Sequence, residues 1–270
     1  MSKLKVRNIT LGQGQPKVCV SLIASNFEEL FAEALRISKL DCDIIEWRAD
    51  YFMYVNDISF MKKAAYFIRY AIEDKPLIFT FRTLDEGGGQ LIEDSYYFEL
   101  NRYMVHTGLV DIIDLEFAKL IDSETDIIQY AKQNNVKVLI SSHDFEKTPS
   151  ESELSESIYD MRHIGADICK IAVMPHSMTD VLKILSSSNE IQTLREEIPF
   201  IMIGMGEVGR MTRLTGELFG SVMTFASSGK HNSAPGQMEI PELRQGLTIL
   251  GKRNEGAHFG EEKNTKNQRN

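Results

Sequence analysis

Two stretches decide the fold: VKVLISSHDF at residues 136–145 and ADICKIAVMP at residues 166–175. Each begins with apolar, β-branched residues, and a polar segment of helical character separates them. Two parallel strands joined by a helical crossover usually lie side by side in one sheet. We therefore expect His143 on the first strand and Lys170 on the second to face the same space.

Lys170 is unusual because it lies within an apolar strand. Lysine is almost never fully buried without a partner, and desolvation lowers its pKa from about 10.4. A neutral amine can attack a ketone and form a Schiff base. The alternative is a lysine that ends its strand and pairs with a carboxylate in water. His143 on the neighbouring strand favours the catalytic interpretation.

The composition is that of an ordinary soluble globular protein. The 270 residues are 43% hydrophobic and 26% charged, with a net charge of −9, which argues against a general nucleic-acid or anionic-membrane binder. No apolar run approaches membrane-spanning length, and the N-terminus lacks the apolar stretch of a signal peptide. We expect a cytoplasmic protein.

The cysteine and histidine residues show no metal-binding or disulfide pattern. Cys19, Cys42 and Cys169 stand singly inside predicted strands or directly before one, which is typical of small buried hydrophobic residues. The six histidines show neither HxxxH nor HxH spacing, so we expect no metal site.

Strand-like runs alternate with amphipathic helical segments along almost the whole chain. The predicted strands are 17–24, 43–47, 76–81, 109–117, 136–141, 166–173, 199–204 and 220–225. The predicted helices are 26–39, 57–73, 93–107, 123–135, 151–164, 178–196, 206–216 and 240–251. Eight such units favour a (β/α)8 TIM barrel, with a doubly wound Rossmann-type sheet as the alternative.

Two terminal regions fall outside this alternation. A short hairpin-like extension, up to about Gln15, precedes the first barrel strand. Residues 1–251 are expected to form a single catalytic domain. Residues 252–270 are almost entirely polar, so we expect a disordered C-terminal tail.

Alternation of side chains along each strand assigns the charged residues to faces. Glu46 and Arg48 share one face of their strand, and Thr80 shares a face with Arg82. Glu86 follows at the start of a glycine-rich loop. In a barrel the reacting groups lie at the carboxyl ends of the strands, where these residues are found.

The next strand adds Asp114 and Glu116, which could either support the barrel interior or contact the site. Charges at strand ends are often only solvated, and an exposed Glu46/Arg48 pair would contribute little to stability. However, five neighbouring strands place charged groups at the same end, which indicates a functional site.

GMGEVG at residues 204–209 matches the dinucleotide fingerprint GxGxxG. It lies in the seventh unit, and the following strand ends without the expected ribose-binding acid. We interpret these glycines as turn and packing residues.

Arg210 and Arg213 are candidates for binding an anionic substrate, because guanidinium groups bind carboxylates through two hydrogen bonds. The loop SSGKHNSAPGQ could close over a pocket or simply connect two elements, and His231 within it is expected at the surface.

Six strings occur in order along the chain: EWRAD, TFRT followed by EGG, SSHDF, DICKIAV, GRMTR and SAPGQ. Together they resemble type I 3-dehydroquinate dehydratase, the Schiff-base-forming enzyme of the shikimate pathway, over roughly residues 4 to 250. The resemblance implies a (β/α)8 barrel that acts on 3-dehydroquinate, needs no metal or organic cofactor and forms a homodimer.

The resemblance also implies roles for individual residues. Lys170 would form the imine, His143 would donate and accept the proton, and Glu86 would orient His143. The implied substrate-binding residues are Ser21, Glu46, Arg48, Arg82, Arg213, Ser233 and Gln237.

Two alternatives remain. A lysine-imine aldolase or transaldolase would also use Lys170, but GSVMTFASSGK at 220–230 supplies no convincing phosphate-binding loop. A non-catalytic anion-binding barrel would keep Arg48, Arg82 and Arg213 but has no need of His143 beside Lys170.

Overall fold

The computed structural model describes residues 3–120, 126–193, 198–230 and 233–251 of the chain. Eight parallel strands form one sheet in the order β10-β3-β4-β5-β6-β7-β8-β9. These strands are β3 (Lys17–Leu22), β4 (Ile44–Arg48), β5 (Leu77–Thr80), β6 (Ile112–Glu116), β7 (Lys137–Asp144), β8 (Ile168–Val173), β9 (Phe200–Gly204) and β10 (Met223–Ala226).

The sheet is a nearly closed barrel. The β9 and β10 edges meet at an isolated parallel bridge between Phe200 and Ser221, next to a 2.9 Å hydrogen bond from Val222 N to Phe200 O. The predicted (β/α)8 fold is therefore confirmed. The alternative doubly wound sheet is excluded, because the strands follow one another in sequence order around the barrel.

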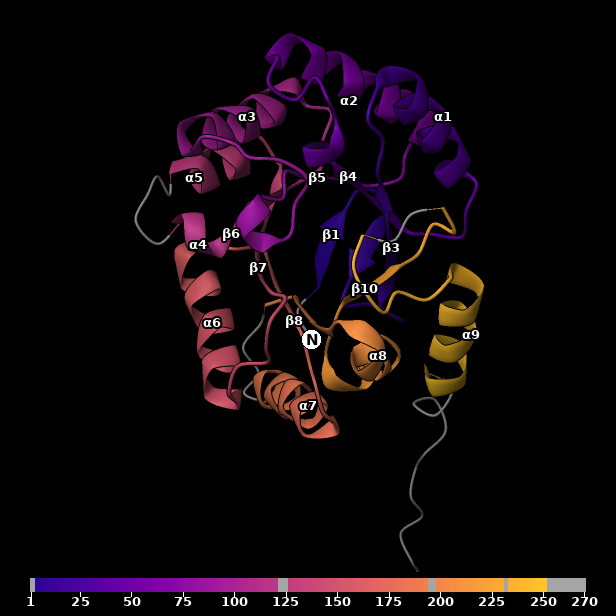
Figure 1. Ribbon diagram of the computed structural model, residues 1–270, viewed down its shortest axis with the longest axis vertical. Coiled ribbons are helices and arrows are strands. Elements are labelled where there is room, and N and C mark those ends of the chain that lie inside the picture. The colour runs from indigo at the N-terminus through magenta and orange to yellow at the C-terminus, as the bar shows by residue number, and fades with distance from the viewer. Residues whose placement is uncertain (1–2, 121–125, 194–197, 231–232, 252–270) are drawn as a thin grey trace, which may run out of the picture.

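Helices surround the strands on the outside (Figure 1). They are α1 (Phe27–Ser38), α2 (Ile58–Ile72), α3 (Asp94–Thr107), α4 (Phe117–Leu120), α5 (Asp126–Gln133), α6 (Glu151–Ile164), α7 (Met178–Thr193), α8 (Gly206–Thr215) and α9 (Ile240–Gly251). The predicted helices 123–135 and 178–196 extend into 121–125 and 194–197, which lie outside the described residues, as do the C-terminal segment 252–270 and His231.

Local sequence explains where helices begin. The side chain of Asn26 accepts a 3.0 Å hydrogen bond from Glu29 N and so caps the start of α1. α6 begins with a capping box, in which Ser150 and Glu153 each accept a hydrogen bond from the other's backbone N–H.

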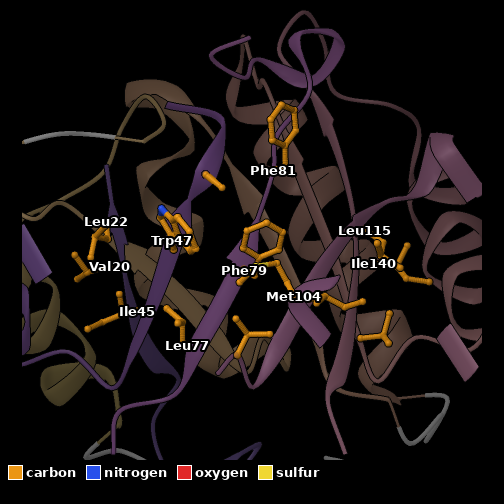
Figure 2. Packing of buried hydrophobic residues seen from close by; sticks show 14 of the residues in the cluster. Val20, Leu22, Ile45, Trp47, Leu77, Phe79, Phe81, Met104, Leu115 and Ile140 are labelled. Carbon is orange, nitrogen blue, oxygen red and sulfur yellow. The ribbon is translucent and has the colours of Figure 1, made fainter. Parts of the chain in front are cut away.

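The apolar core has two layers, because successive strand residues point to opposite faces. Ile45, Trp47 and Phe79 point outward and pack beneath the helices (Figure 2). The barrel interior contains a second cluster formed by Ile44, Ile78, Ile112, Leu139, Ile168, Ile201 and Met223 among others. The shared face predicted for Glu46 and Arg48 is the inward one, because Ile44 on the same face belongs to the inner cluster.

An antiparallel hairpin covers the amino end of this barrel. Strands β1 (Leu4–Val6) and β2 (Ile9–Leu11) pair ahead of β3, and Val6 and Leu11 join the inner apolar cluster. The hairpin-like extension predicted from the sequence is thus present and closes one end of the barrel.

Three carboxylates, called here the amino-end carboxylates, join strands at this end. Asp43, Asp111 and Asp167 directly precede β4, β6 and β8, and each accepts a backbone N–H from the preceding strand. The donors are Val18 N at 2.7 Å, Leu77 N at 2.8 Å and Val138 N at 2.9 Å. Their recurrence at alternate strands indicates a structural role, because buried backbone donors need partners.

Two further findings concern the described part of the chain. None of its helices has the length and apolar character needed to cross a membrane. Cys19, Cys42 and Cys169 are buried and free, as the sequence predicts.

Candidate active site

A cavity lies at the carboxyl end of the barrel strands. Nine of the ten site residues predicted from the sequence line it, and the exception is Ser21. The lining residues are Glu46, Arg48, Arg82, Glu86, Gly87, His143, Phe145, Lys170, Ala172, Ile203, Met205, Arg213, Phe225, Ser233, Ala234 and Gln237.

Lys170 points into the barrel from β8 and is only 6% exposed. Its Nζ lies 3.7 Å from Glu46 Oε1 and 4.3 Å from the centre of the Phe225 ring. Burial raises the pKa of Glu46, but Lys170 and Arg48 lower it by more, so that the net shift is downward. Glu46 is therefore an ionised carboxylate that can stabilise positive charge on the lysine nitrogen or on an imine formed there.

Ser21 lies behind Glu46, outside the cavity lining. Its hydroxyl donates a 2.6 Å hydrogen bond to Glu46 Oε2 and lies 2.8 Å from Ser233 Oγ. Ser233 and Gln237 in turn exchange two hydrogen bonds, of 2.9 and 3.0 Å. Ser21 thus connects an acid of the site to the loop after β10, which in this structure covers the cavity.

His143 and Glu86 form a buried pair, with His143 Nδ1 2.8 Å from Glu86 Oε2. Burial, together with Arg82, Lys170 and Arg48, holds the pKa of His143 well below its usual value. Burial also raises the pKa of Glu86 to about 8, with Arg82 opposing the rise. The low pKa keeps the imidazole neutral, so that it can act as a base when Glu86 is ionised.

Arg82 is already engaged with protein acceptors. Its Nη1 donates to Glu86, Glu116 and Ser141 at 3.0 to 3.2 Å, and its Nη2 donates to Asp114 at 2.5 Å. Asp114 and Glu116 do not line the cavity. The sequence left their role open, and the structure shows them supporting Arg82 from within the barrel.

Arg48 is held by an acid of its own segment. Its Nε and Nη2 donate to the two carboxylate oxygens of Asp50 at 2.9 and 2.8 Å. Burial lowers the pKa of Arg48, but the hydrogen bonds to Asp50 raise it by more. Arg48 therefore reaches the cavity with a fixed orientation.

Arg213 has no carboxylate within ion-pair distance in the described segments. It is 2% exposed, and its Nη2 donates to Pro235 O at 3.0 Å, while its Nε has no partner. Burial, with a contribution from Arg210, lowers its pKa to about 10, so that it is still charged at neutral pH. A buried cation with an unused donor on a cavity wall is suited to bind an anionic group.

Arg210 and Arg213 have different environments although both lie on α8. Arg210 is on the outer side, where its Nη1 lies 3.2 Å from Glu207 Oε2 and its side chain is 40% exposed. Only one of these two candidates therefore lines the cavity.

The GMGEVG glycines act in packing, as the sequence predicts. A Cβ on Gly209 would lie 2.3 Å from the backbone of Gly204, and Gly206 has a φ of +68°. These glycines let the start of α8 contact the end of β9 closely, which orients the helix that bears Arg213.

The sequence analysis missed the apolar wall of the cavity and one buried acid. Phe225 and Ala172 could have been found by extending strand parity, since both share the inward face of their strands with other interior residues. Phe145 and Met205 lie just beyond strand ends, where parity no longer applies. Asp50 lies within EWRAD, but nothing in the sequence shows its contacts.

The described residues contain no group of three or more His, Cys, Asp or Glu side chains that could hold a metal ion. The cavity presents a buried amine beside a carboxylate, a neutral imidazole paired with an acid, and a guanidinium without an anion in the described chain. This set can form an imine with a carbonyl compound that bears a carboxylate, and can move a proton beside it.

A family model described as type I 3-dehydroquinase matches residues 18–254. The 3-dehydroquinate dehydratase of Clostridium novyi is 40% identical over 250 residues, covering 93% of this chain and 98% of that protein. The enzyme of the same name from Salmonella typhimurium is 44% identical over 250 residues, with 93% and 99% covered.

Solved structures agree with these matches. The type I 3-dehydroquinate dehydratase from Clostridium difficile, determined with covalently modified comenic acid, superposes with a TM-score of 0.88 at 42% identity, covering 94% of this chain and 100% of that chain. The 3-dehydroquinate dehydratase from Geobacillus kaustophilus gives a TM-score of 0.90 at 33% identity, with 93% and 99% covered.

Proposed function

The chain belongs to the type I 3-dehydroquinase family, and from this premise we propose which of its residues perform the reaction. The protein is a hydro-lyase of the shikimate pathway that removes water from 3-dehydroquinate and gives 3-dehydroshikimate through a Schiff base. This membership decides against the aldolase and binding-barrel alternatives. The observation that best supports the residue assignment is the shared cavity of Lys170, the His143–Glu86 pair and Arg213.

Lys170 is the nucleophile in this proposal. Its amine adds to the C3 ketone, and loss of water gives an iminium, which is a strong electron sink. Glu46 at 3.7 Å stabilises the positive charge, while Phe225 keeps one side of the nitrogen away from water. The iminium makes the neighbouring C2 proton acidic enough to be removed by a weak base.

His143 is that base. Its Nδ1–H donates to Glu86, which leaves Nε2 free to take the C2 proton and form an enamine. The enamine then expels the C1 hydroxyl, and the imidazolium supplies the proton with which it leaves as water. The imine is finally hydrolysed, which returns Lys170 to its amine form.

The remaining residues bind and enclose the substrate. Arg213 binds the substrate carboxylate, since it has an unused donor and no anionic partner in the described chain. Hydroxyl and carboxylate contacts come from Glu46, Arg48 and Arg82, with Ser233 and Gln237 over the cavity and Ser21 acting through Glu46.

We also propose a single catalytic domain over residues 1–251 and a homodimer located in the cytoplasm. Three free buried cysteines are compatible with a reducing compartment, and the dimer rests on the family resemblance. Light scattering of the purified protein tests the dimer, which a monomeric mass would exclude.

The decisive experiment traps the imine. Intact-mass measurement after mixing the protein with 3-dehydroquinate and borohydride should give one stable adduct, and peptide mapping should place it at Lys170. Lys170→Ala is the matched control and should give no adduct and no turnover. An adduct at another lysine, or normal turnover by the variant, would refute the assignment.

A further inference from the structure

Glu86 is not carried by a strand. It lies at the end of a 3-10 helix, Leu84–Glu86, inside the connection between β5 and α3. A group that orients His143 must itself be held in place, and a connection of this kind is more mobile than a strand unless it is anchored. The question is therefore what anchors residues 82–90.

Asp50 anchors this segment from the β4 side. Its Oδ1 accepts Arg82 N at 3.3 Å and its Oδ2 accepts Gly89 N at 2.9 Å. Its backbone oxygen also accepts a 2.7 Å hydrogen bond from the Gln90 side chain. The same carboxylate holds Arg48, so one buried group connects a substrate-binding guanidinium with the segment that carries Glu86.

Glu116 anchors the segment from the β6 side. Its Oε1 accepts Thr83 N at 2.8 Å and Arg82 Nη1 at 3.1 Å, and its Oε2 accepts Thr83 Oγ1 at 2.7 Å. Asp50 and Glu116 are each 1% exposed, and neither lines the cavity. They therefore hold residues 82–90 by hydrogen bonds from the β4 side and the β6 side, and neither acid faces the cavity.

The segment between the anchors has little free space. Gly88 N donates to Thr83 O at 2.7 Å, and a Cβ on Gly88 would lie 1.9 Å from Arg82 O. A Cβ on Gly87 would lie 2.6 Å from the Phe145 ring. Glu86 thus lies on a turn whose position depends on the hydrogen bonds at its two ends.

We propose that Asp50 and Glu116 form a carboxylate clamp, a pair of positioning residues that hold Glu86 against His143 Nδ1. The inference rests on the proposed roles of Glu86 and His143. Burying two carboxylates is not an efficient way to stabilise a fold, because apolar residues of similar volume often do at least as well. Positioning a proton-transfer pair gives these buried charges a function, since small displacements of a base lower the rate steeply.

The charged groups around Glu86 come from several elements. They are Arg82 after β5, Asp114 and Glu116 on β6, His143 on β7, Lys170 on β8 and Arg48 on β4. Among them Glu116 and Asp114 raise the pKa of Glu86, and Arg82 lowers it. Loss of the Glu116 charge should therefore shift the titration of the His143–Glu86 pair to lower pH, which a purely structural role does not predict.

The test uses the variants Asp50→Asn and Glu116→Gln. Rates are divided by the concentration of active sites that form a borohydride-reducible imine with 3-dehydroquinate, so that misfolded protein is not counted. Asn in place of Asp50 puts an NH2 group where one carboxylate oxygen accepts two donors. We expect kcat to fall about 10- to 100-fold in both variants while imine formation persists. Asp50→Asn should also raise KM, because it releases Arg48. In Glu116→Gln the acid limb of the pH profile should move to lower pH.

Asp85→Asn is the matched control, because Asp85 belongs to the same turn but is exposed. It should keep the wild-type kcat, KM and pH profile. Wild-type kcat per trapped site in both clamp variants, with only a lower Tm, would overturn the clamp. Failure of the wild-type protein to form any adduct would instead refute the proposed function itself, so the two failures are distinguishable.

Discussion

The two ends of the barrel contain the same kind of residue in different surroundings. At the amino end, Asp43, Asp111 and Asp167 accept backbone N–H groups of neighbouring strands. At the carboxyl end, the cavity-lining acids Glu46 and Glu86 face cations. A carboxylate satisfied by backbone donors stabilises the fold, whereas one that balances a cation beside open space is available for chemistry. This division agrees with the usual placement of function in such barrels.

The two ends also differ in whether their charged side chains have all their hydrogen-bonding groups paired. At the amino end Asp111 has its oxygens occupied by Arg7, Arg69 and Leu77 N. At the carboxyl end Arg213 retains an Nε without a partner. Incomplete pairing costs stability, and at Arg213 a bound anionic group would complete the pairing.

The strongest test of this contrast is His143→Ala. Turnover should fall by about 10²- to 10⁴-fold, because the change removes the proposed general base and keeps the proposed nucleophile. Borohydride trapping should still label Lys170 with substrate. If the variant turns over normally, or if it no longer forms the adduct, the division of roles between Lys170 and His143 is wrong.

Arg213→Ala should have the next largest effect. Loss of the carboxylate-binding guanidinium should raise KM for 3-dehydroquinate about 10- to 100-fold, as expected for a charge-assisted interaction. Arg210→Ala is the matched control on the same helix, and its steady-state kinetics should stay close to wild type, since Arg210 is exposed and pairs with Glu207. Equal effects of the two changes would remove Arg213 from the site.

The pH dependence of the carboxyl end follows from the buried pair. The active form has an ionised Glu86 and a neutral His143, so one further proton on the pair inactivates it. Because burial raises the pKa of Glu86 to about 8, kcat/KM should rise with pH and level off near that value. The expected slope below it is about tenfold per pH unit. Glu86→Gln should abolish this limb, and a limb that persists in the variant belongs to another group.

The smallest effect on activity is expected at the amino end. Asp111→Asn weakens the contacts to Arg69 and Arg7 and should lower the free energy of unfolding by about 1–3 kcal/mol. The kcat and KM of the folded protein should be unchanged, because the residue is remote from the cavity. Asp74→Asn is the control, since that side chain is 91% exposed and lies 3.8 Å from Arg7. A lower kcat in Asp111→Asn would contradict the conclusion that the amino-end carboxylates stabilise the fold without affecting catalysis.

Much of the fold follows from local pattern. Alternation of strands with amphipathic helices predicts the barrel, and strand parity correctly places Glu46 and Arg48 inward and Ile45 and Trp47 outward. Local periodicity is sufficient here because each strand must bury both faces and each helix must bury one.

Contacts between strands could not be predicted in the same way. The sequence left open whether Asp114 and Glu116 support the barrel or contact the site. The hydrogen bonds that the Arg82 guanidinium donates to both carboxylates show that they support Arg82. Ser21 stays a predicted substrate-binding residue, and only the structure shows that its hydroxyl bonds to Glu46 at the edge of the cavity lining. The clamp acid Asp50 could not be recognised at all, because its partners on residues 82 and 89 become neighbours only in the folded chain.

The sequence by itself therefore determined the elements, their order and the faces of the strands, and by resemblance it led to the proposal that Lys170 is the nucleophile and His143 the base. These depend on residue type and spacing along the chain. The tertiary structure alone decided which acid pairs with which cation, why Arg213 and not Arg210 lines the cavity, and how Glu86 is held. Such pairings join segments that are far apart in the chain and close in the folded protein. A change of about one ångström in the donor–acceptor distance determines whether a hydrogen bond exists.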